Sequence, residues 1–340
     1  MPARLFKHDP EIVELASGAG GVLAAPGLQG RVFCHIAGEL MHRLDVERLE
    51  RPSDTEFNNL GGNSLWPAPE GGDYAFNYLP GSNEWLVQDG IGKAPCRLTG
   101  RDASRVAMEK DIELVNRRGA RIRVRFSRRI AAQDADAQVG GFAVRAVAYR
   151  CEDALTPLDS HATEDVLLAA WSLEQFPGAD GVMAFGKVSN PEQAINTDFY
   201  GDPGERILRG EGFFTFALGG EARGQIGVAV AGGPELIGAL DSNRDLLILR
   251  KTPPRDGVYF NIADNDQPEG AYSAADRYSV FNGGALDFFE LETVGPMAVN
   301  AGRVAACTLE SETIIMQGAA GELRRYLAER EGLVLEEDVS

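Results

Sequence analysis

Short apolar runs separated by glycine- and proline-bearing turns extend along almost the whole chain. We count about fifteen such runs, spaced roughly 8 to 15 residues apart. The first three, within residues 11–36, predict an opening β-meander whose first strand spans Ile12 to Leu15. The 40 glycines and 17 prolines are dispersed and form no repeat, which suits many short strands better than a few long helices. The pattern therefore predicts an all-β, antiparallel architecture.

The clearest strand signal lies just after residue 120. Ile122, Val124 and Phe126 alternate there with arginines, which is typical of a strand with one buried and one solvated face. The Asn-Arg-Arg-Gly sequence at 116–119 predicts a hairpin turn to the preceding strand. We interpret the arginines as a solvated strand face rather than an anion site.

Other segments need a choice between helix and strand. Residues 164–174 have the leucines and alanines that favour a helix, but we expect a buried strand because the neighbouring runs are strands. Residues 257–263 and 276–293 are also expected to form strands. The one good amphipathic helix is short, lies near the C-terminus at 321–332, and stops at Gly332.

Length and charge limit the classes of partner. Large β architectures often reach 340 residues as one unit, so we expect a single domain over 1–340 with its core at about 11–322. The formal net charge of −18 argues against nucleic acid and against an anionic membrane surface. The first residues contain no apolar signal region and no run is long enough to span a membrane. These features predict a soluble, cytoplasmic protein, and they do not indicate its oligomeric state.

The sequence offers no support for a metal or a cofactor. The four cysteines lie far apart without a CxxC pair and are expected to be buried free thiols: Cys34, Cys96, Cys151 and Cys307. The acidic loop at 264–266 lacks the glycine and the terminal glutamate of an EF-hand. No P-loop, dinucleotide fingerprint, HExxH or GxSxG motif occurs. We therefore expect no metal, no cofactor, and no phosphoryl-transfer, nicotinamide or serine-hydrolase chemistry.

One segment has the composition of a sugar site. Aromatic residues from Trp66 to Trp85 are interleaved with amides and carboxylates, including Asn58 and Glu70. Aromatic rings can cover the C–H face of a pyranose while polar groups bind its hydroxyls. The alternative is a long turn region whose aromatics close the edge of the core. Glu70 lies in a Pro-Glu-Gly-Gly turn, where the glycines would let a sugar approach the backbone.

A second polar cluster occurs later in the chain. Asp198, Asp202 and Arg206 lie in a loop bounded by glycine and proline. We consider Asp198 and Arg206 as substrate-binding residues, and an ion-paired loop is the alternative.

Four blocks, in order, resemble an uncharacterised family of the galactose-mutarotase-like superfamily: GGNSLWPAPEGG, TDFYGDPGERIL, GEARGQIGVAV and DFFELETVGP. The resemblance covers about Ile12 to Glu322. It implies an antiparallel β-supersandwich with a carbohydrate cleft on the concave face of a sheet. In aldose 1-epimerases a glutamate in a segment like FELET is the general base on the anomeric hydroxyl, which implies Glu292 here. Glu290 lies on the same face of that strand, and two carboxylates so close raise one another's pKa.

The general acid is where the chain departs from those enzymes. They protonate the ring oxygen with a histidine, whereas the matching segment LLAAWSLEQF has Trp171 and no histidine. His8 and His42 are expected to be exposed, and His35 to be packed. His161 is nearest in sequence to the expected position. The resemblance therefore leaves Glu70 or His161 as the acid.

These observations give one leading hypothesis and two alternatives. The first is a protein that binds a small carbohydrate and works as an epimerase or mutarotase at the anomeric carbon. A non-catalytic sugar-binding or sensor protein fits the missing histidine. A lyase or hydrolase of an acidic polysaccharide would need Arg206, Arg223 and Arg244 to converge, and the net charge disfavours it. The predicted site comprises Glu292, Glu70 and His161 as catalytic residues, with Trp66, Asn58, Asp198, Arg206 and Glu290 as substrate-binding residues.

Overall fold

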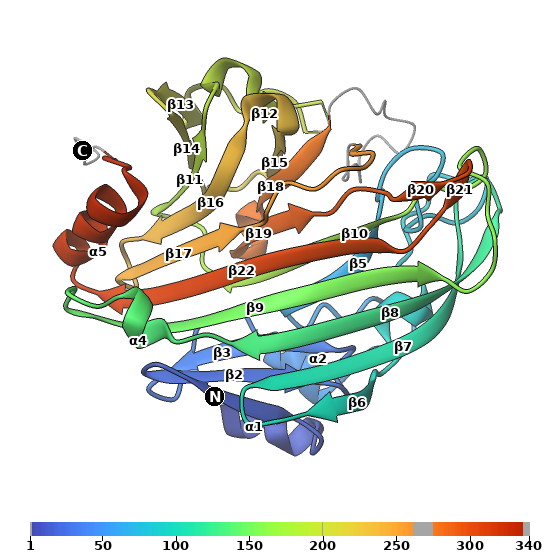
Figure 1. The fold of residues 1–340 in the computed structure, drawn as a ribbon, viewed down its shortest axis with the longest axis horizontal. Coiled ribbons are helices and arrows are strands. Elements are labelled where there is room, and N and C mark those ends of the chain that lie inside the picture. Colours follow the sequence, from blue (N-terminus) through green and yellow to red (C-terminus); the bar gives the residue numbers. More distant parts are fainter. Residues whose placement is uncertain (1, 199, 261–274, 336–340) are drawn as a thin grey trace.

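Two ten-stranded antiparallel sheets pack face to face (Figure 1). The structure, a computed structural model, describes residues 2–198, 200–260 and 275–335. Strands β2 and β3 of the first sheet lie behind the second sheet (Figure 1), where β2 contacts β8 and β9, and β3 contacts β9. Every strand pairing in the described part is antiparallel, so the predicted all-β antiparallel architecture is confirmed.

The first sheet carries the strands that later form the site. Its order is β1 (Val13–Ser17), β2 (Gly20–Ala25), β3 (Arg31–Ile36), β5 (Gly62–Ala68), β10 (Ala169–Pro177), β19 (Phe288–Val294), β18 (Asp276–Asn282), β15 (Gly224–Ala229) and β12 (Ile195–Asn196), with β4 (Glu39–Leu40) paired to β3. The chain leaves and re-enters this sheet several times, so neighbouring strands come from distant parts of the sequence.

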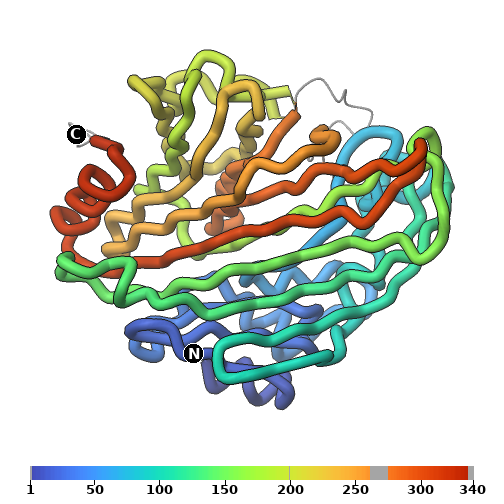
Figure 2. The backbone as a smooth tube through the Cα atoms, viewed as in Figure 1, coloured from blue at the N-terminus to red at the C-terminus, as the bar shows by residue number. Residues whose placement is uncertain are grey.

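The second sheet contains the longest strands. Its order is β13 (Ile207–Gly210), β14 (Phe213–Ala217), β11 (Val182–Val188), β16 (Pro234–Asp241), β17 (Leu246–Lys251), β22 (Cys307–Gly318), β9 (Val144–Pro157), β8 (Arg121–Ala132), β7 (Arg105–Val115) and β6 (Arg97–Arg101). The C-terminal strand β22 lies between β17 and β9 (Figure 2). A small ribbon, β20 (Val299–Asn300) with β21 (Arg303–Val304), lies outside both sheets.

Short helices connect and cover the sheets. They are α1 (Pro2–His8), α2 (Val46–Glu50), α3 (Asp89–Gly92), α4 (Ala135–Gln138) and α5 (Ala320–Tyr326), the 3-10 turns η1 (Pro191–Gln193), η2 (Gly204–Arg206), η3 (Val230–Gly232) and η4 (Gly284–Leu286), and the π-helical turn η5 (Leu327–Glu331). The predicted C-terminal helix is confirmed as α5 with η5, and Gly332 ends it with φ +67°. Helix α1 was not expected from the sequence.

Most of the strand predictions are confirmed. The first strand and the 116–119 hairpin form as expected, since β7 and β8 pair from Val115 and Arg121 onward. Within 164–174 the strand begins at Ala169. Residues 276–293 form two strands rather than one run. In 257–263 the described residues make only a single bridge, at Val258, and 261–263 lie outside the described residues.

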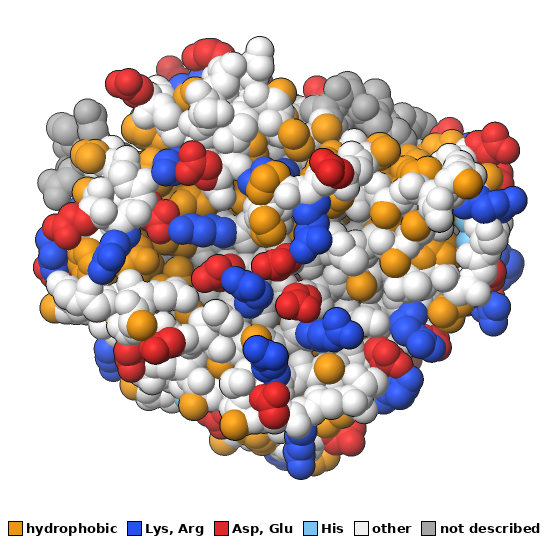
Figure 3. Space-filling model, viewed as in Figure 1, with side chains coloured by type: hydrophobic (Ala, Val, Ile, Leu, Met, Phe, Trp, Pro, Cys, Tyr) orange, Lys and Arg blue, Asp and Glu red, His pale blue; other side chains and the backbone are white. Residues whose placement is uncertain are grey.

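Arg121, Arg123 and Arg125 of β8 line the outer face of the second sheet, as predicted, whereas Arg128 on the same strand points inward and pairs with the buried Asp153. Arg125 binds Asp111 on β7 at 2.7 Å, and Arg121 binds Glu113 on the same strand at 2.7 Å. Basic and acidic side chains are interspersed over this face (Figure 3). The arrangement is that of a solvated strand face, and such exposed pairs contribute little to stability.

The four cysteines are buried and free, as expected. In the described part of the chain, no helix is both long enough and apolar enough to cross a membrane.

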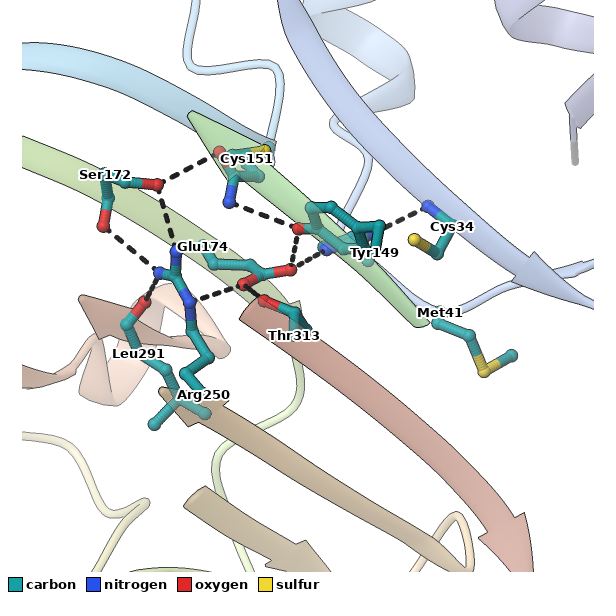
Figure 4. Close-up of polar contacts among 12 residues, drawn as sticks. Cys34, Met41, Tyr149, Cys151, Ser172, Glu174, Arg250, Leu291 and Thr313 are labelled. Atoms are coloured by element: carbon teal, nitrogen blue, oxygen red, sulfur yellow. Dashed lines mark hydrogen bonds and ion pairs between the residues drawn. The ribbon is translucent and has the colours of Figure 1, made fainter. Parts of the chain in front are cut away.

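A buried polar network joins the two sheets (Figure 4). Glu174 on β10 and Arg250 on β17 are both 0% exposed, and the Arg250 Nε lies 2.8 Å from Glu174 Oε2. Thr313 on β22 donates its hydroxyl to the same oxygen at 2.8 Å, and Tyr149 on β9 donates to Oε1. The carboxylate of one strand thus has partners on three strands of the opposite sheet.

His42 belongs to this network, so the prediction that it is exposed was wrong. It is only 2% exposed, and its Nδ1 accepts the backbone N–H of Cys34 at 2.9 Å. Its Nε2 therefore carries the proton and donates to Glu174 Oε1 at 2.7 Å. His42 follows β4 in a loop, yet it lies in the core, because the buried carboxylate of Glu174 requires hydrogen-bond donors.

Breaking the Glu174–Arg250 pair should strongly destabilise the protein. In Arg250→Met, we expect the free energy of unfolding to fall by about 3–5 kcal/mol, because a buried carboxylate loses its counter-charge. Urea-induced unfolding at pH 7 measures this change. The control is Arg125→Met, which removes an exposed pair and should leave stability almost unchanged. Equal losses in the two variants would contradict the assignment.

The same pair predicts an acid limit of stability. Burial raises the pKa of Glu174, but the charge of Arg250 and the hydrogen bonds from His42 and Tyr149 outweigh it and lower the pKa from 4.5 to about 2. A depressed pKa stabilises the fold above pH 4.5, and the stabilisation disappears as the pH falls toward 2. The free energy of unfolding of wild type, measured between pH 6 and pH 2, should fall by about 3 kcal/mol from this group. Glu174→Gln should lack this pH-dependent loss.

Candidate functional site

A cavity of about 150 Å³ opens on the outer face of the first sheet. It arises from strand alternation: on β10, Glu174 points into the sandwich, while Leu173 and Gln175 point the other way into the cavity. The lining residues are Arg31, Phe57, Asn59, Ser64, Trp66, Glu70, Trp85, Trp171, Leu173, Gln175, Arg223, Gln225, Phe281, Leu286, Phe288, Glu290 and Glu292. The cavity therefore combines aromatic rings with amides, carboxyls and guanidinium groups.

Three carboxyl groups meet in this cavity. Glu290 and Glu292 project from the same face of β19, and their carboxyl groups are hydrogen bonded to each other. Glu70 is close enough for its charge to act on Glu292. All three are buried, with exposed fractions of 7%, 1% and 5% for Glu290, Glu292 and Glu70. Such a cluster cannot be fully ionised, because like charges in a buried site repel strongly.

The surroundings of Glu292 favour its protonated form. Burial raises its pKa well above the usual value, and the charges of Glu290 and Glu70 raise it further. Its Oε2 accepts hydrogen bonds from the Trp171 indole at 3.1 Å and the Gln225 amide at 3.2 Å. Neither donor carries a charge, so neither offsets the burial of a carboxylate as a cation would.

The surroundings of Glu290 are different. Burial raises its pKa as well, but the nearby positive charges of Arg43 and Arg31 oppose this effect. Gln175 donates to Glu290 Oε1 at 2.6 Å, and Arg43 binds the carbonyl end of the same amide at 3.1 Å. Arg43 therefore fixes which end of Gln175 faces the carboxyl. The pair is asymmetric, with Glu290 better suited to be the carboxylate and Glu292 the acid.

Aromatic rings form the other wall. Trp66 on β5 lies directly opposite Trp171 on β10, and the rings meet edge to face with centroids 6.1 Å apart. Phe57 also packs edge to face with Trp66, with ring centroids 5.4 Å apart. Trp85 donates its indole N–H to Glu70 Oε1 at 3.1 Å. The aromatic segment predicted from the sequence thus supplies both rings and a carboxyl to one cavity.

The structure brings together four of the eight predicted site residues: Trp66, Glu70, Glu290 and Glu292. The other four do not line the cavity. Asn58 binds the backbone of Ser53, and Arg206 donates to the carbonyl groups of Ala217 and Gly219.

His161 and Asp198 are the remaining two. His161 Nε2 lies 2.7 Å from Asp159 Oδ1 in the loop that follows β9. Asp198 follows β12 at the edge of the first sheet, where its charge acts on the buried Asp276. Both lie on loops whose distance from β19 cannot be deduced from the sequence.

Sequence reasoning missed several residues that shape the site. Trp171, Gln175 and Gln225 each touch one of the paired carboxyls. The period-two spacing of Trp171 and Gln175 was a usable signal, because it places both on the face opposite Glu174. Arg31 and Arg43 gave no such signal, since their electrostatic effect on Glu290 depends on how segments far apart in the sequence come together.

Within the described ranges, no group of three or more histidine, cysteine, aspartate or glutamate side chains could hold a metal ion. The acidic loop at 264–266 lies outside the described residues.

Comparisons with known proteins identify the fold. The model of a family described as "Family of unknown function (DUF6786)" matches residues 2–336. No curated protein matches the sequence.

Two solved structures are similar over nearly their whole length. A candidate aldose 1-epimerase from Escherichia coli K12 has a TM-score of 0.53 at 14% identity, covering 91% of this chain and 99% of that one. A galactose mutarotase-like protein from Lactobacillus casei ATCC 334 also has a TM-score of 0.53, at 11% identity and 89% and 99% coverage. These likenesses confirm the predicted galactose-mutarotase-like fold.

Replacing Glu292 by glutamine should stabilise the protein at high pH. Because the folded pKa is raised above 4.5, protonation stabilises the fold below pH 4.5, and this stabilisation is lost as the pH rises through the folded pKa. Glutamine cannot ionise, so at pH 8 the free energy of unfolding of the variant should exceed that of wild type by about 0.5–2 kcal/mol. This difference should shrink toward pH 4. Urea unfolding at both pH values measures it. A variant that is less stable than wild type at pH 8, by an amount that shrinks toward pH 4, would show that Glu292 is ionised in the fold.

Proposed function

The chain belongs to DUF6786, a family of unknown function, and we propose that it binds a small neutral sugar in the outer-face cavity and exchanges its anomers. The observation that carries the proposal is the buried pair Glu290 and Glu292, in which the pKa of Glu292 is raised well above its usual value while the charges of Arg43 and Arg31 oppose the rise at Glu290. A carboxylate and a carboxylic acid side by side are the base and acid that opening of a sugar ring requires.

The pair performs the reaction without an outside acid. Glu290 accepts the proton of the anomeric hydroxyl while the bond between C1 and the ring oxygen breaks, and Glu292 gives its proton to that oxygen. The open-chain aldehyde then rotates about its C1–C2 bond. Ring closure reverses both transfers: Glu292 regains a proton from the hydroxyl and Glu290 returns one to the carbonyl oxygen. The numbers of protons and bonds balance over the cycle.

This assignment exchanges the roles that the resemblance implies, in which Glu292 is the base. The raised pKa of Glu292 supports its role as acid, and the charges of Arg43 and Arg31 near Glu290 support a base there. Glu70 remains a third carboxyl within electrostatic reach of Glu292, and it can bind a sugar hydroxyl.

The charges in the cavity support a neutral ligand. Those of its three carboxyl groups that are ionised would repel a uronate, and the arginines proposed for an acidic polysaccharide do not converge: Arg223 lines the cavity, whereas Arg244 binds the backbone oxygen of Met41. The hydrogen bond between Glu290 and Glu292 also holds them closer than the roughly 5 Å or more that glycosidases need between their two carboxyl groups. Both points disfavour the lyase or hydrolase.

A non-catalytic sugar-binding protein is the second candidate. The observation that favours it is the lining of the cavity, which includes no histidine among the described residues. In this case the same cavity would bind sugar, and the buried carboxyls would serve only as hydrogen-bond partners. Binding without anomer exchange distinguishes this candidate from the first.

Anomer exchange should depend on both carboxyls. In Glu292→Gln and in Glu290→Gln, we expect the exchange rate to fall about 10²–10⁴-fold, the usual contribution of a general acid or base. Exchange is measured by NMR across a panel of aldoses. The matched control is Glu113→Gln, on the outer face of the second sheet, which should retain wild-type rates.

The outcomes separate the candidates. If wild type accelerates exchange and Glu292→Gln does so equally well, the mechanism is wrong. If calorimetry detects sugar binding but wild type accelerates no exchange, the non-catalytic candidate holds. If no sugar binds, both candidates fail.

A further inference from the structure

Two large apolar side chains stand exposed at the mouth of the cavity. Trp85 is 40% exposed and Leu286 is 53% exposed, and both line the cavity. The deeper rings are covered by protein, since Trp66 and Trp171 are only 7% and 1% exposed. An exposed tryptophan beside a polar cavity is typical of a surface that a ligand with an apolar face covers.

The ring of Trp85 is held in place without any ligand. Its indole N–H is bonded to Glu70 at 3.1 Å, and its edge packs against Phe57 with centroids 6.2 Å apart. Its backbone forms a bridge with Tyr78, which closes the turn between them. A ring whose position is fixed in advance loses little conformational entropy when a ligand stacks on it.

The cavity itself is small. At about 150 Å³, it is below the roughly 300–1,000 Å³ of typical ligand pockets. One sugar ring would fill it, with its anomeric centre at Glu290 and Glu292. Any further part of the ligand would extend over the mouth, where Trp85 and Leu286 lie.

We propose that the natural ligand is an oligosaccharide whose reducing-end unit occupies the cavity and whose next unit stacks on Trp85. This inference rests on the proposed function and specifies its substrate class. Stacking on the C–H face of the second sugar explains why an aromatic ring is kept rigid and exposed there. Leu286 provides an apolar surface beside the same unit.

The experiment compares disaccharides with monosaccharides. Calorimetry on wild type measures the dissociation constants of glucose, maltose, cellobiose and lactose. We expect at least one disaccharide to bind about tenfold more tightly than glucose. In Trp85→Ala this preference should disappear, while glucose binding changes less. Trp85→Phe keeps a ring but loses the bond to Glu70, and should keep most of the preference. Leu208→Ala, at a residue that is 62% exposed on β13, is the control and should keep all of it.

The failures are distinguishable. If wild type binds glucose and every disaccharide equally, or if Trp85→Ala weakens both classes by the same factor, the stacking proposal is overturned and the proposed function stands. A preference lost as fully in Trp85→Phe as in Trp85→Ala would assign it to the bond with Glu70 and overturn stacking. If no sugar binds, the proposed function itself fails.

Discussion

The ion pair between Glu174 and Arg250 is the constraint on which the rest of the structure depends. Hydrophobic burial holds two sheets together but does not fix their relative position, because it has no direction. Two fully buried charges do fix it, since each costs several kcal/mol unless it meets its partner at close range. Arg250 also donates to the backbone oxygens of Ser172 and Leu291. One side chain of the second sheet thereby positions two adjacent strands of the first, β10 and β19.

This constraint reaches the site through the alternation of a strand. Gln175 follows Glu174 on β10 and points to the opposite face, where it donates to Glu290. Trp171 lies on that face too and donates to Glu292. A slip of β10 by one residue would exchange the two faces, placing Glu174 in the cavity and Gln175 in the core. The inward network and the outward site therefore depend on the same register.

The sequence predicted those residues of the cavity that a local pattern places together. Glu290 and Glu292 share a face because they are two residues apart on a strand, and Trp66 and Glu70 belong to one aromatic and polar segment. His42 shows the limit, because its burial depends on Glu174, 132 residues away. Asn58 and His161 do not line the cavity, for a related reason: composition identifies a polar loop but does not tell which end of the sandwich the loop reaches. Arg31 became significant only when β3 paired beside β5.

The buried carboxyl pair explains how the site can work without a histidine. In the proposed reaction, an acid must be neutral and a base ionised at the same pH, which two isolated glutamates would not achieve. Burial raises both pKa values, and Arg31 and Arg43 lie near Glu290 and oppose that rise. In the proposed reaction the pair starts with one proton, on Glu292, and one charge, on Glu290. Because ring opening adds one proton to Glu290 and removes one from Glu292, the pair keeps the same number of protons, and the site is ready for ring closure as soon as ring opening ends. Trp171 stands where the resemblance expects the histidine, and it donates to Glu292, the carboxyl that the proposed mechanism uses as the acid.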